Sequence, residues 1–351
     1  MDQPAEQWLR DLVARATGMP GSGLAVRRLA GHASRRTYWR VGEPGGHTVV
    51  VMVVSPDAPP DEIGKGAARG PAPFAEVQRY LAGIGVRVPE IVEWSQDEGY
   101  VVLEDLGDDM MVTRLTAGAP REPLYRAAID QLAWMRVRAE EAPDPACLAF
   151  RRAYDYDVYL WELEHFLEWA LVARAGSGLP AAEQRVVEAH FAAMARRLAA
   201  EQGGFTHRDY QSRNLMILRN GTQAVIDFQD ALQGPRQYDL VALLRDSYVA
   251  LDQDFIARMV RHYLERTFAL GGPALAEGGF REVFDLLTIQ RKLKDAGRFV
   301  YIDRVKGNPD FLRFVPAALR YAHEAFSRCP ELEELHRVLA RHVPELDPAR
   351  Q

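Results

Sequence analysis

The sequence predicts an α+β protein of two lobes. Residues 1–105 are expected to form a small lobe built on an antiparallel sheet, and residues 106–351 a larger, mainly helical lobe. The strand-like runs of the small lobe lie in roughly the first hundred residues, whereas apolar residues recur at helical spacing after Gly107. The chain has 351 residues, 48% of them hydrophobic, which is enough to bury one large core or two lobes.

Three short runs in the small lobe have the composition of β-strands. They are rich in β-branched and aromatic residues, are bounded by Gly and Pro, and cover residues 37–41, 48–54 and 100–104. A segment dense in Pro, Gly and Ala, residues 55–73, leads to a helix-like segment at 74–82. We therefore expect the order strand, strand, loop, helix, strand.

Two stretches of the large lobe show the periodicity of amphipathic helices. The first apolar face consists of Leu124, Ala128, Ile129, Leu132 and Met135. The second consists of Val186, Val187, His190, Phe191, Met194 and Leu198. We interpret both faces as core.

Charge and cysteine content limit the function classes. The formal net charge of -6 gives no electrostatic argument for binding nucleic acid. The two cysteines, Cys147 and Cys329, are isolated, no signal-like segment starts the chain, and no apolar run approaches twenty residues. We expect a cytoplasmic enzyme without a membrane span, and the sequence leaves its oligomeric state open.

One motif carries chemistry, because it spaces a carboxylate and an amide as phosphoryl transfer requires. Asp209 would accept the proton of an acceptor hydroxyl, and Asn214 with Asp227 would hold the Mg²⁺ ions that bridge the phosphates of ATP. The residues that match H-R-D-x-x-x-x-N are His207, Arg208, Asp209, Tyr210, Gln211, Ser212, Arg213 and Asn214.

The two metal ligands need a chain reversal between them. Apolar runs at 215–218 and 224–227 flank Asn220 and Gly221, a dipeptide that tolerates the positive φ angles of a tight hairpin. Such a hairpin would bring Asn214 and Asp227 together at one end. Zinc is the poorer interpretation, because His207 and Asp209 have no second His or Cys at ligand spacing.

Together with Gly31 to Arg36, the 226–231 segment and Tyr238-Asp239-Leu240, this motif resembles the aminoglycoside phosphotransferase superfamily, whose fold is protein-kinase-like. The chain looks most like the branch of bacterial kinases that phosphorylate the anomeric hydroxyl of N-acetylmuramate and N-acetylglucosamine during peptidoglycan recycling. That likeness includes Met52, the 57–60 run and the 290–294 run.

The resemblance implies a nucleotide site between the lobes. Adenine would meet the hinge backbone from Glu104 to Leu106, and the phosphates would lie under the turn that contains Gly31, Ser34, Arg35 and Arg36. Asp239 resembles the buried kinase aspartate that supports the catalytic loop.

The chain departs from ordinary kinases on its third strand, where Met52 replaces the phosphate-binding lysine. The related branch shares this Met. Lys65 is the only lysine of the small lobe, and it would either fold over the phosphates or remain a solvated loop residue.

Sugar recognition is expected from Glu164 and Trp169, which lie in an acidic and aromatic segment. Arg291, Lys294 and Arg298 would meet a lactyl carboxylate if the substrate is N-acetylmuramate, or else form a solvated helix face.

Two other interpretations stay open. An aminoglycoside, choline or homoserine acceptor would use the same chemistry, and an acidic cleft without nearby Arg would favour a cationic acceptor. A non-catalytic nucleotide-binding protein is indicated only by Met52.

Overall fold

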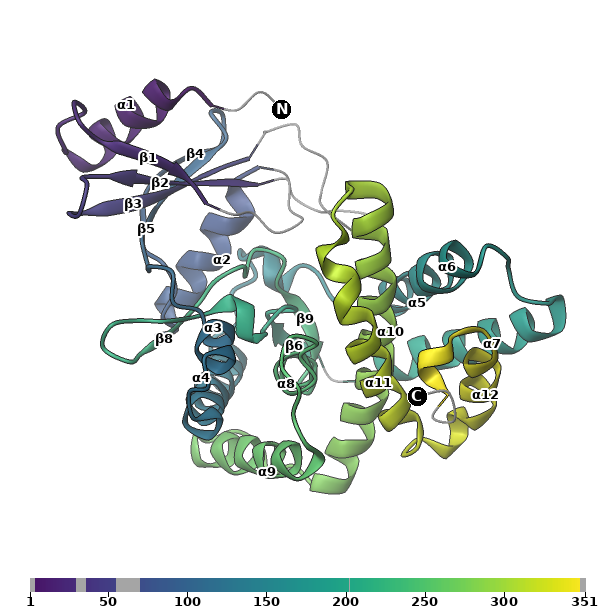
Figure 1. Ribbon diagram of the computed structural model, residues 1–351. Helices are drawn as coiled ribbons and strands as arrows, with labels where there is room; N and C mark the ends of the chain where they lie inside the picture. The colour runs from purple at the N-terminus through teal and green to yellow at the C-terminus, as the bar shows by residue number, and fades with distance from the viewer. Residues whose placement is uncertain (1–3, 30–35, 55–69, 202, 348–351) are drawn as a thin grey trace.

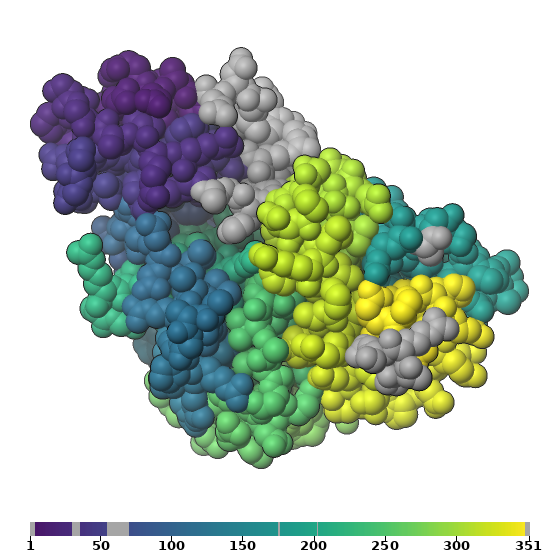
Figure 2. Space-filling model, in the orientation of Figure 1, coloured from purple at the N-terminus to yellow at the C-terminus, as the bar shows by residue number. Residues whose placement is uncertain are grey.

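The computed structural model describes residues 4–29, 36–54, 70–201 and 203–347. One five-stranded sheet lies near the N-terminus, and helices form most of the remainder (Figure 1). In the space-filling view the sheet-bearing segment stands above the helical part, and the C-terminal half of helix α10 rises beside it (Figure 2). This arrangement agrees with the predicted α+β class.

The sheet is antiparallel throughout and has the strand order β1-β2-β3-β5-β4. Its strands are β1 (Ala25–Arg28), β2 (Thr37–Gly42), β3 (Thr48–Val53), β4 (Ile91–Ser95) and β5 (Tyr100–Glu104). The three predicted strands are confirmed as β2, β3 and β5. The edge strands β1 and β4 were not predicted, because edge strands are half exposed and lack a clear apolar run.

The two faces of the sheet pack against different partners, since side chains alternate along each strand. Helix α1 (Glu6–Thr17) covers the outer face, where Leu12 and Val51 belong to one cluster. On the inner face, Met52 and Leu103 join a core shared with α2 (Ala72–Gly83) and the helical part. The sheet is therefore anchored to the helices by a continuous apolar core.

The helical part carries both predicted apolar faces. Those faces lie on α4 (Arg121–Glu141) and α7 (Ala181–Ala199), where all the predicted members except Leu124, Val186 and His190 are buried. The other helices are α3 (Met111–Thr116), α5 (Tyr156–Phe166), α6 (Ala173–Ala175), α8 (Tyr238–Leu244), α9 (Gln253–Ala269), α10 (Glu277–Lys306), α11 (Val315–Phe326) and α12 (Glu333–His342). A π-helical stretch, η2 (Leu167–Val172), follows α5.

Two short β-ribbons lie between the sheet and the helices and carry the candidate site. One pairs β7 (Leu215–Ile217) with β8 (Gln223–Val225), and the other pairs β6 (Gly203–Thr206) with β9 (Leu232–Pro235). The turn of the first ribbon contains Gly221 at φ 83°, a left-handed conformation that glycine adopts without strain. The predicted hairpin is therefore confirmed.

No helix of the described residues is both long and apolar enough to cross a membrane. The two cysteines, Cys147 and Cys329, are buried and free.

Candidate active site

A loop that follows β6 carries the predicted base, and a buried carboxylate holds its backbone. Asp239, at the start of α8, accepts hydrogen bonds from the backbone N–H groups of His207 at 2.7 Å and Arg208 at 2.9 Å. Arg208 has a φ of 77°, which is uncommon for a residue with a side chain. The two bonds from Asp239 stabilise this conformation, as expected from its kinase-like position.

His207 links the loop to the strand that leads to Asp227. Its Nδ1 lies 3.2 Å from the backbone N–H of Asp209, and its Nε2 lies 3.0 Å from the carbonyl oxygen of Ile226. These partners match a neutral ring that accepts at Nδ1 and donates at Nε2. Burial lowers the pKa of His207, which favours the same neutral form.

The Asp209 carboxylate lines a cavity, and one of its two oxygens accepts a hydrogen bond from Arg291. Arg291 Nη2 donates to Asp209 Oδ1 at 2.9 Å, and its Nη1 donates to the carbonyl oxygen of Arg208 at 2.6 Å. Burial by itself would raise the pKa of Asp209, but Lys294, Arg291 and Arg208 hold that pKa well below its usual range. The carboxylate is therefore ionised at neutral pH, as a proton acceptor must be.

Asn214 and Asp227 lie together at the end of the β7–β8 ribbon. Asn214 Nδ2 is 3.5 Å from Asp227 Oδ2 and donates to the carbonyl oxygen of Asp209 at 2.8 Å. Asp227 has a φ of 65°, and its Oδ1 accepts a hydrogen bond from Gln229 at 2.9 Å. Burial raises the pKa of Asp227 although Arg36 opposes the shift.

This donor set fits Mg²⁺, which prefers oxygen ligands and retains room for water and phosphate. The side-chain oxygens of Asn214 and Asp227 come from adjacent chain segments, and Asp227 is 44% exposed toward the cavity. A strained backbone at a candidate ligand is typical of functional positions. The two residues would hold the metal beside Asp209.

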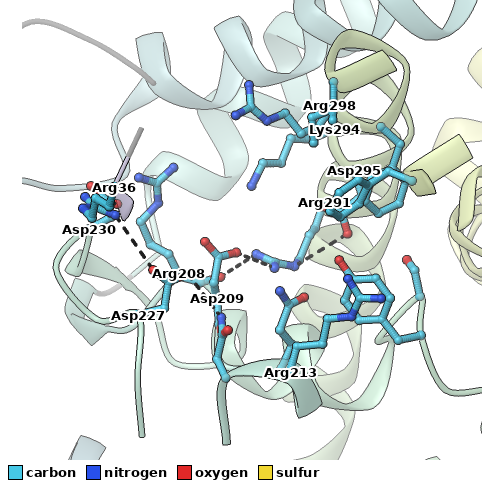
Figure 3. Close-up of a pocket in the computed structure, with 17 residues that line it drawn as sticks. Arg36, Arg208, Asp209, Arg213, Asp227, Asp230, Arg291, Lys294, Asp295 and Arg298 are labelled. Atoms are coloured by element: carbon cyan, nitrogen blue, oxygen red, sulfur yellow. Dashed lines mark hydrogen bonds and ion pairs between the residues drawn. The ribbon is translucent and has the colours of Figure 1, made fainter. Parts of the chain in front are cut away.

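A cavity of about 230 Å³ joins the base and the metal-ligand candidates. Among the described residues, six cationic side chains and four carboxylates line it, and Figure 3 shows Arg208, Lys294 and Arg298 extending to the same side of Asp209. Its cations are Arg36, Arg208, Arg213, Arg291, Lys294 and Arg298, and its acids are Asp209, Asp227, Asp230 and Asp295.

Arg36 is the described cation nearest the metal-ligand candidate Asp227. Its guanidinium lies 3.9 Å from Asp227 and 3.7 Å from Asp230, and its side chain is 17% exposed. Met52, at the position of the usual kinase lysine, is fully buried in the core and takes no part in the cavity. The cation beside the metal ligands thus comes from the segment before β2 and not from β3.

The predicted hinge residues line a second cavity. Glu104 and Leu106 border a space of about 720 Å³, and the Glu104 carboxylate accepts a hydrogen bond from Arg87 Nη1 at 2.8 Å. Arg40 and Thr48 both bond Asp105, which ties the sheet to the hinge. The side chains of Glu104 and Asp105 therefore connect the hinge to neighbouring segments through ion pairs and hydrogen bonds.

The predicted sugar contacts are distributed differently from expectation. Glu164 is exposed on α5, and Trp169 packs edge-on against Tyr301 with ring centroids 5.1 Å apart. Neither lines the cavity of Asp209. Arg298 and Lys294 do line it, whereas Arg291 is 2% exposed and bonded to the base. In the structure Arg291 thus contacts the candidate base, and its contact with a substrate stays a prediction.

Sequence reasoning missed the role of Glu162, which is fully buried behind the cavity. Its carboxylate lies 3.4 Å from Arg208 and 3.7 Å from Lys294, and it accepts a hydrogen bond from Gln290 at 2.7 Å. The helical periodicity could have predicted that Glu162 is buried, because Glu162 falls on the apolar face of α5 between Tyr159 and Phe166. A carboxylate on a buried face needs paired cations.

Four predicted nucleotide contacts, Gly31, Ser34, Arg35 and Lys65, lie outside the described residues. Their roles stay predictions.

Comparison with known proteins agrees with the kinase-like geometry. Residues 25–278 match the family described as "Phosphotransferase enzyme family". The sequence is 35% identical over 314 residues to a protein of Pseudomonas aeruginosa named N-acetylmuramate/N-acetylglucosamine kinase, covering 88% of this chain and 86% of that one. A protein of the same name from Neisseria meningitidis is 31% identical, with 90% and 89% covered.

Among solved structures, the choline kinase LicA of Streptococcus pneumoniae superposes with a TM-score of 0.60. It is 14% identical, with 92% of this chain and 98% of that chain covered, a likeness that concerns the fold alone.

Proposed function

Because the chain belongs to the phosphotransferase enzyme family, we propose that it transfers the γ-phosphoryl group of ATP to the C1 hydroxyl of an amino sugar. The acceptor would be N-acetylmuramate or N-acetylglucosamine, as in the names of its relatives. Such an activity would serve the recycling of peptidoglycan sugars in the cytoplasm. The observation that carries the proposal is the placement of Asp209 beside Asn214 and Asp227, all lining one cavity.

The proposed transfer moves one proton and one phosphoryl group. Asp209 takes the proton from the sugar hydroxyl while the hydroxyl oxygen bonds to the γ-phosphorus. The bond between the γ-phosphorus and the β–γ bridging oxygen breaks, which releases ADP. Arg291 keeps the carboxylate ionised and oriented. The C1 hydroxyl belongs to a hemiacetal and is more acidic than an ordinary alcohol, so a single carboxylate base is sufficient once the sugar is oriented.

Mg²⁺, bound by Asn214 and Asp227, would neutralise charge on the phosphates. Arg36 would add a cation at the same end of the cavity, since its guanidinium already lies within 4 Å of Asp227. We place the adenine near the backbone of Glu104 to Leu106 and divide the chain into nucleotide-binding (1–105) and catalytic (106–351) lobes.

The charges of the cavity argue against a cationic acceptor. Aminoglycosides and choline are cations, and Arg208, Lys294 and Arg298 would repel them on the side of the cavity that faces the base. The alternative of a non-catalytic protein does not explain why Arg208 has a strained backbone that a hydrogen bond to Asp239 stabilises, because such strain is typical of functional sites.

The test is to identify the product. Incubate the protein with ATP, Mg²⁺ and either sugar, then record proton NMR spectra with phosphorus coupling. We expect phosphorus coupling at the anomeric proton, and a phosphate that is released in mild acid. A product phosphorylated at another position, or phosphorylation of kanamycin alone, would contradict the proposal.

A further inference from the structure

The loop from His207 to Asn214 carries the candidate base near its start and a metal-ligand candidate at its end. Inside the loop, the backbone N–H of Gln211 donates to the Asp209 carbonyl oxygen at 2.9 Å, and the backbone N–H of Asn214 donates to the Gln211 carbonyl oxygen at 2.8 Å. Both bonds join residues of the same loop, so they do not by themselves place its end relative to the rest of the fold. The contacts that fix this end decide where Asn214 presents its side-chain oxygen.

A second buried carboxylate, Asp246, contacts this end of the loop through Ser212. The backbone N–H of Ser212 donates to Asp246 Oδ2 at 3.0 Å, and the Ser212 hydroxyl donates to the same oxygen at 2.5 Å. The other carboxylate oxygen accepts a hydrogen bond from the backbone N–H of Tyr248 at 3.0 Å. Ser212 and Asp246 are 0% and 1% exposed, so water does not compete for these bonds.

The two carboxylates that hold the loop belong to one short segment. Asp239 lies at the start of α8, and Asp246 follows the end of that helix by two residues. Their spacing of seven residues corresponds to about two turns of helix, which brings both side chains to the same side of the segment. Asp239 bonds the backbone at the start of the loop, and Asp246 bonds it at Ser212. The candidate base lies between the two points of attachment.

The residue after Asp246 is itself held in place by a helix from the far end of the chain. Ser247 Oγ accepts a hydrogen bond from Lys292 Nζ at 3.1 Å, and the same ammonium pairs with Asp295 at 2.6 Å. Lys292 and Asp295 both belong to α10, and Lys292 is 2% exposed. The segment that carries Asp246 is therefore attached to α10 as well as to α8, and it is a fixed point for the orientation of Ser212.

Ser212 and Asn214 are the first and last residues of one 3₁₀ turn, η3 (Ser212–Asn214). Because such a turn has a fixed rotation per residue, the orientation of Ser212 determines the direction of the Asn214 side chain. The Asn214 amide nitrogen donates to the Asp209 carbonyl oxygen at 2.8 Å, so the amide oxygen is the atom suited to bind a metal ion. A displacement of Ser212 would move this oxygen, whereas the Asp209 carboxylate has its own hydrogen bond from Arg291.

We propose that Asp246 is a positioning residue for the metal-binding half of the site. Through Ser212 it sets the place of the Asn214 side-chain oxygen, as Asp239 sets the place of the start of the loop. The inference rests on one part of the proposed function, the binding of Mg²⁺ with ATP by Asn214 and Asp227, and it is independent of the acceptor. A purely structural role of Asp246 would lower stability without changing the contribution of the metal to nucleotide binding.

The experiment measures the dissociation constant of ATP by calorimetry, once with Mg²⁺ and once with EDTA, in the wild type and in Ser212→Ala. The variant loses the hydroxyl donor and keeps the backbone bond to Asp246, so the loop retains one of its two contacts. We expect the dissociation constant with Mg²⁺ to rise about three- to tenfold, the scale of one buried hydrogen bond, and the constant in EDTA to change less than about twofold.

Thr288→Val is the matched control, because Thr288 is fully buried and its hydroxyl donates at 2.8 Å to the Phe284 carbonyl oxygen within its own helix, α10. This variant also loses one buried hydrogen bond, but Thr288 does not line the cavity. Its unfolding temperature should fall as that of Ser212→Ala does, and both dissociation constants of ATP should remain those of the wild type.

A double-mutant cycle tests the contact between the two residues directly. Asp246→Asn should weaken ATP binding with Mg²⁺ and leave binding in EDTA unchanged. The combined variant should lose less affinity than the product of the two single losses, because both changes remove the same hydrogen bond. If thermal unfolding shows that Asp246→Asn is not folded, the comparison of Ser212→Ala with Thr288→Val decides alone.

An unchanged affinity in Ser212→Ala, or an equal loss with Mg²⁺ and in EDTA, would overturn the positioning role and leave the metal ligands standing. A wild type that binds ATP equally well with and without Mg²⁺ would refute the metal site, and this inference with it. A product test that excludes the amino sugars would leave the inference intact, because the binding measurement uses no acceptor.

Discussion

Arg291 donates a hydrogen bond from Nη2 to Oδ1 of Asp209 at 2.9 Å, although the guanidinium comes from a helix more than eighty residues further along the chain. The same guanidinium donates to the Arg208 carbonyl oxygen at 2.6 Å and to the Tyr238 hydroxyl at 3.0 Å. It thereby holds the candidate base, the strained residue before it and the helix that supports the loop. Each of these contacts can be tested separately from substrate binding.

Asp209→Asn should lower kcat by about two to four powers of ten, because the amide cannot accept the proton of the acceptor hydroxyl. ATP binding, measured by isothermal titration, should be largely retained. Asp310→Asn is a suitable control, because the Asp310 side chain, in η4 (Pro309–Phe314), is exposed and does not line the cavity. Near-normal turnover of Asp209→Asn would remove the assignment of this base.

Arg291→Lys should lower kcat about tenfold or more, since an ammonium cannot reproduce the planar contacts to Asp209, Arg208 and Tyr238. The Michaelis constant for ATP should change little. Arg291→Met should in addition move the acid limb of the pH–rate profile to higher pH, because loss of a cation raises the pKa of Asp209. A profile that keeps its acid limb in place would show that Arg291 does not tune the base.

Asp227→Ala should abolish Mg²⁺-dependent nucleotide binding, because the remaining ligand Asn214 is neutral. The measurement is titration of ATP with and without Mg²⁺, followed by thermal unfolding to show that the variant is folded. Asp254→Ala, at an exposed position in the first turn of α9, is the matched control. Retained Mg²⁺-dependent binding in Asp227→Ala would exclude this residue as a ligand.

Two cations are candidates to take over the role of the kinase lysine, whose position on β3 is occupied by Met52. Arg36→Leu should raise the Michaelis constant for ATP and lower kcat by about tenfold or more, because Arg36 already lies beside Asp227. Lys65→Ala should do the same if Lys65 reaches the phosphates. Unchanged kinetics in Lys65→Ala would identify a solvated loop residue, and unchanged kinetics in Arg36→Leu would leave Mg²⁺ and backbone amides to bind the phosphates.

His165 should make stability dependent on pH. Burial lowers its pKa to about 4, with a further contribution from Lys294, so the unfolded chain binds the proton more tightly. A depressed histidine pKa costs stability as pH falls from about 6.5 towards 4, roughly 1–2 kcal/mol at pH 5 after allowance for solvent screening. Urea unfolding of His165→Gln should show a smaller loss between pH 7 and 5 than the wild type.

The exposed residue His47 provides the control, and His47→Gln should lose stability on acidification as the wild type does. A wild-type loss equal to that of His165→Gln would contradict the expected role of the buried ring.

The elements whose local signals were strong were predictable. The strands β2, β3 and β5, helix α2 and the β7–β8 hairpin have β-branched runs, a helix-like segment or an Asn-Gly turn, signals that depend only on neighbouring residues. Edge strand β1 has only two apolar residues among four, so its pairing with β2 supplies what its own sequence lacks.

The acidic residues of α5 show where local reasoning reaches its limit. Glu164 and Glu162 stand two residues apart on one helix, and composition alone cannot tell which of them is buried. The structure buries Glu162 behind Arg208 and Lys294 and leaves Glu164 in solvent, because the apolar face of α5 packs against α10. The direction of a side chain is set by what its helix packs against.

The sequence by itself determined the reaction type, since the spacing from Asp209 to Asn214 and the hairpin before Asp227 are local and need no distant contact. It also determined that β3 carries no lysine. Tertiary structure alone decided that Arg291 bonds the Asp209 carboxylate, that Arg36 lies beside Asp227, and that Lys294 and Arg298 line the same cavity. These roles depend on contacts between segments far apart in the chain, and such contacts form only when the core brings the sheet, the loop and α10 together.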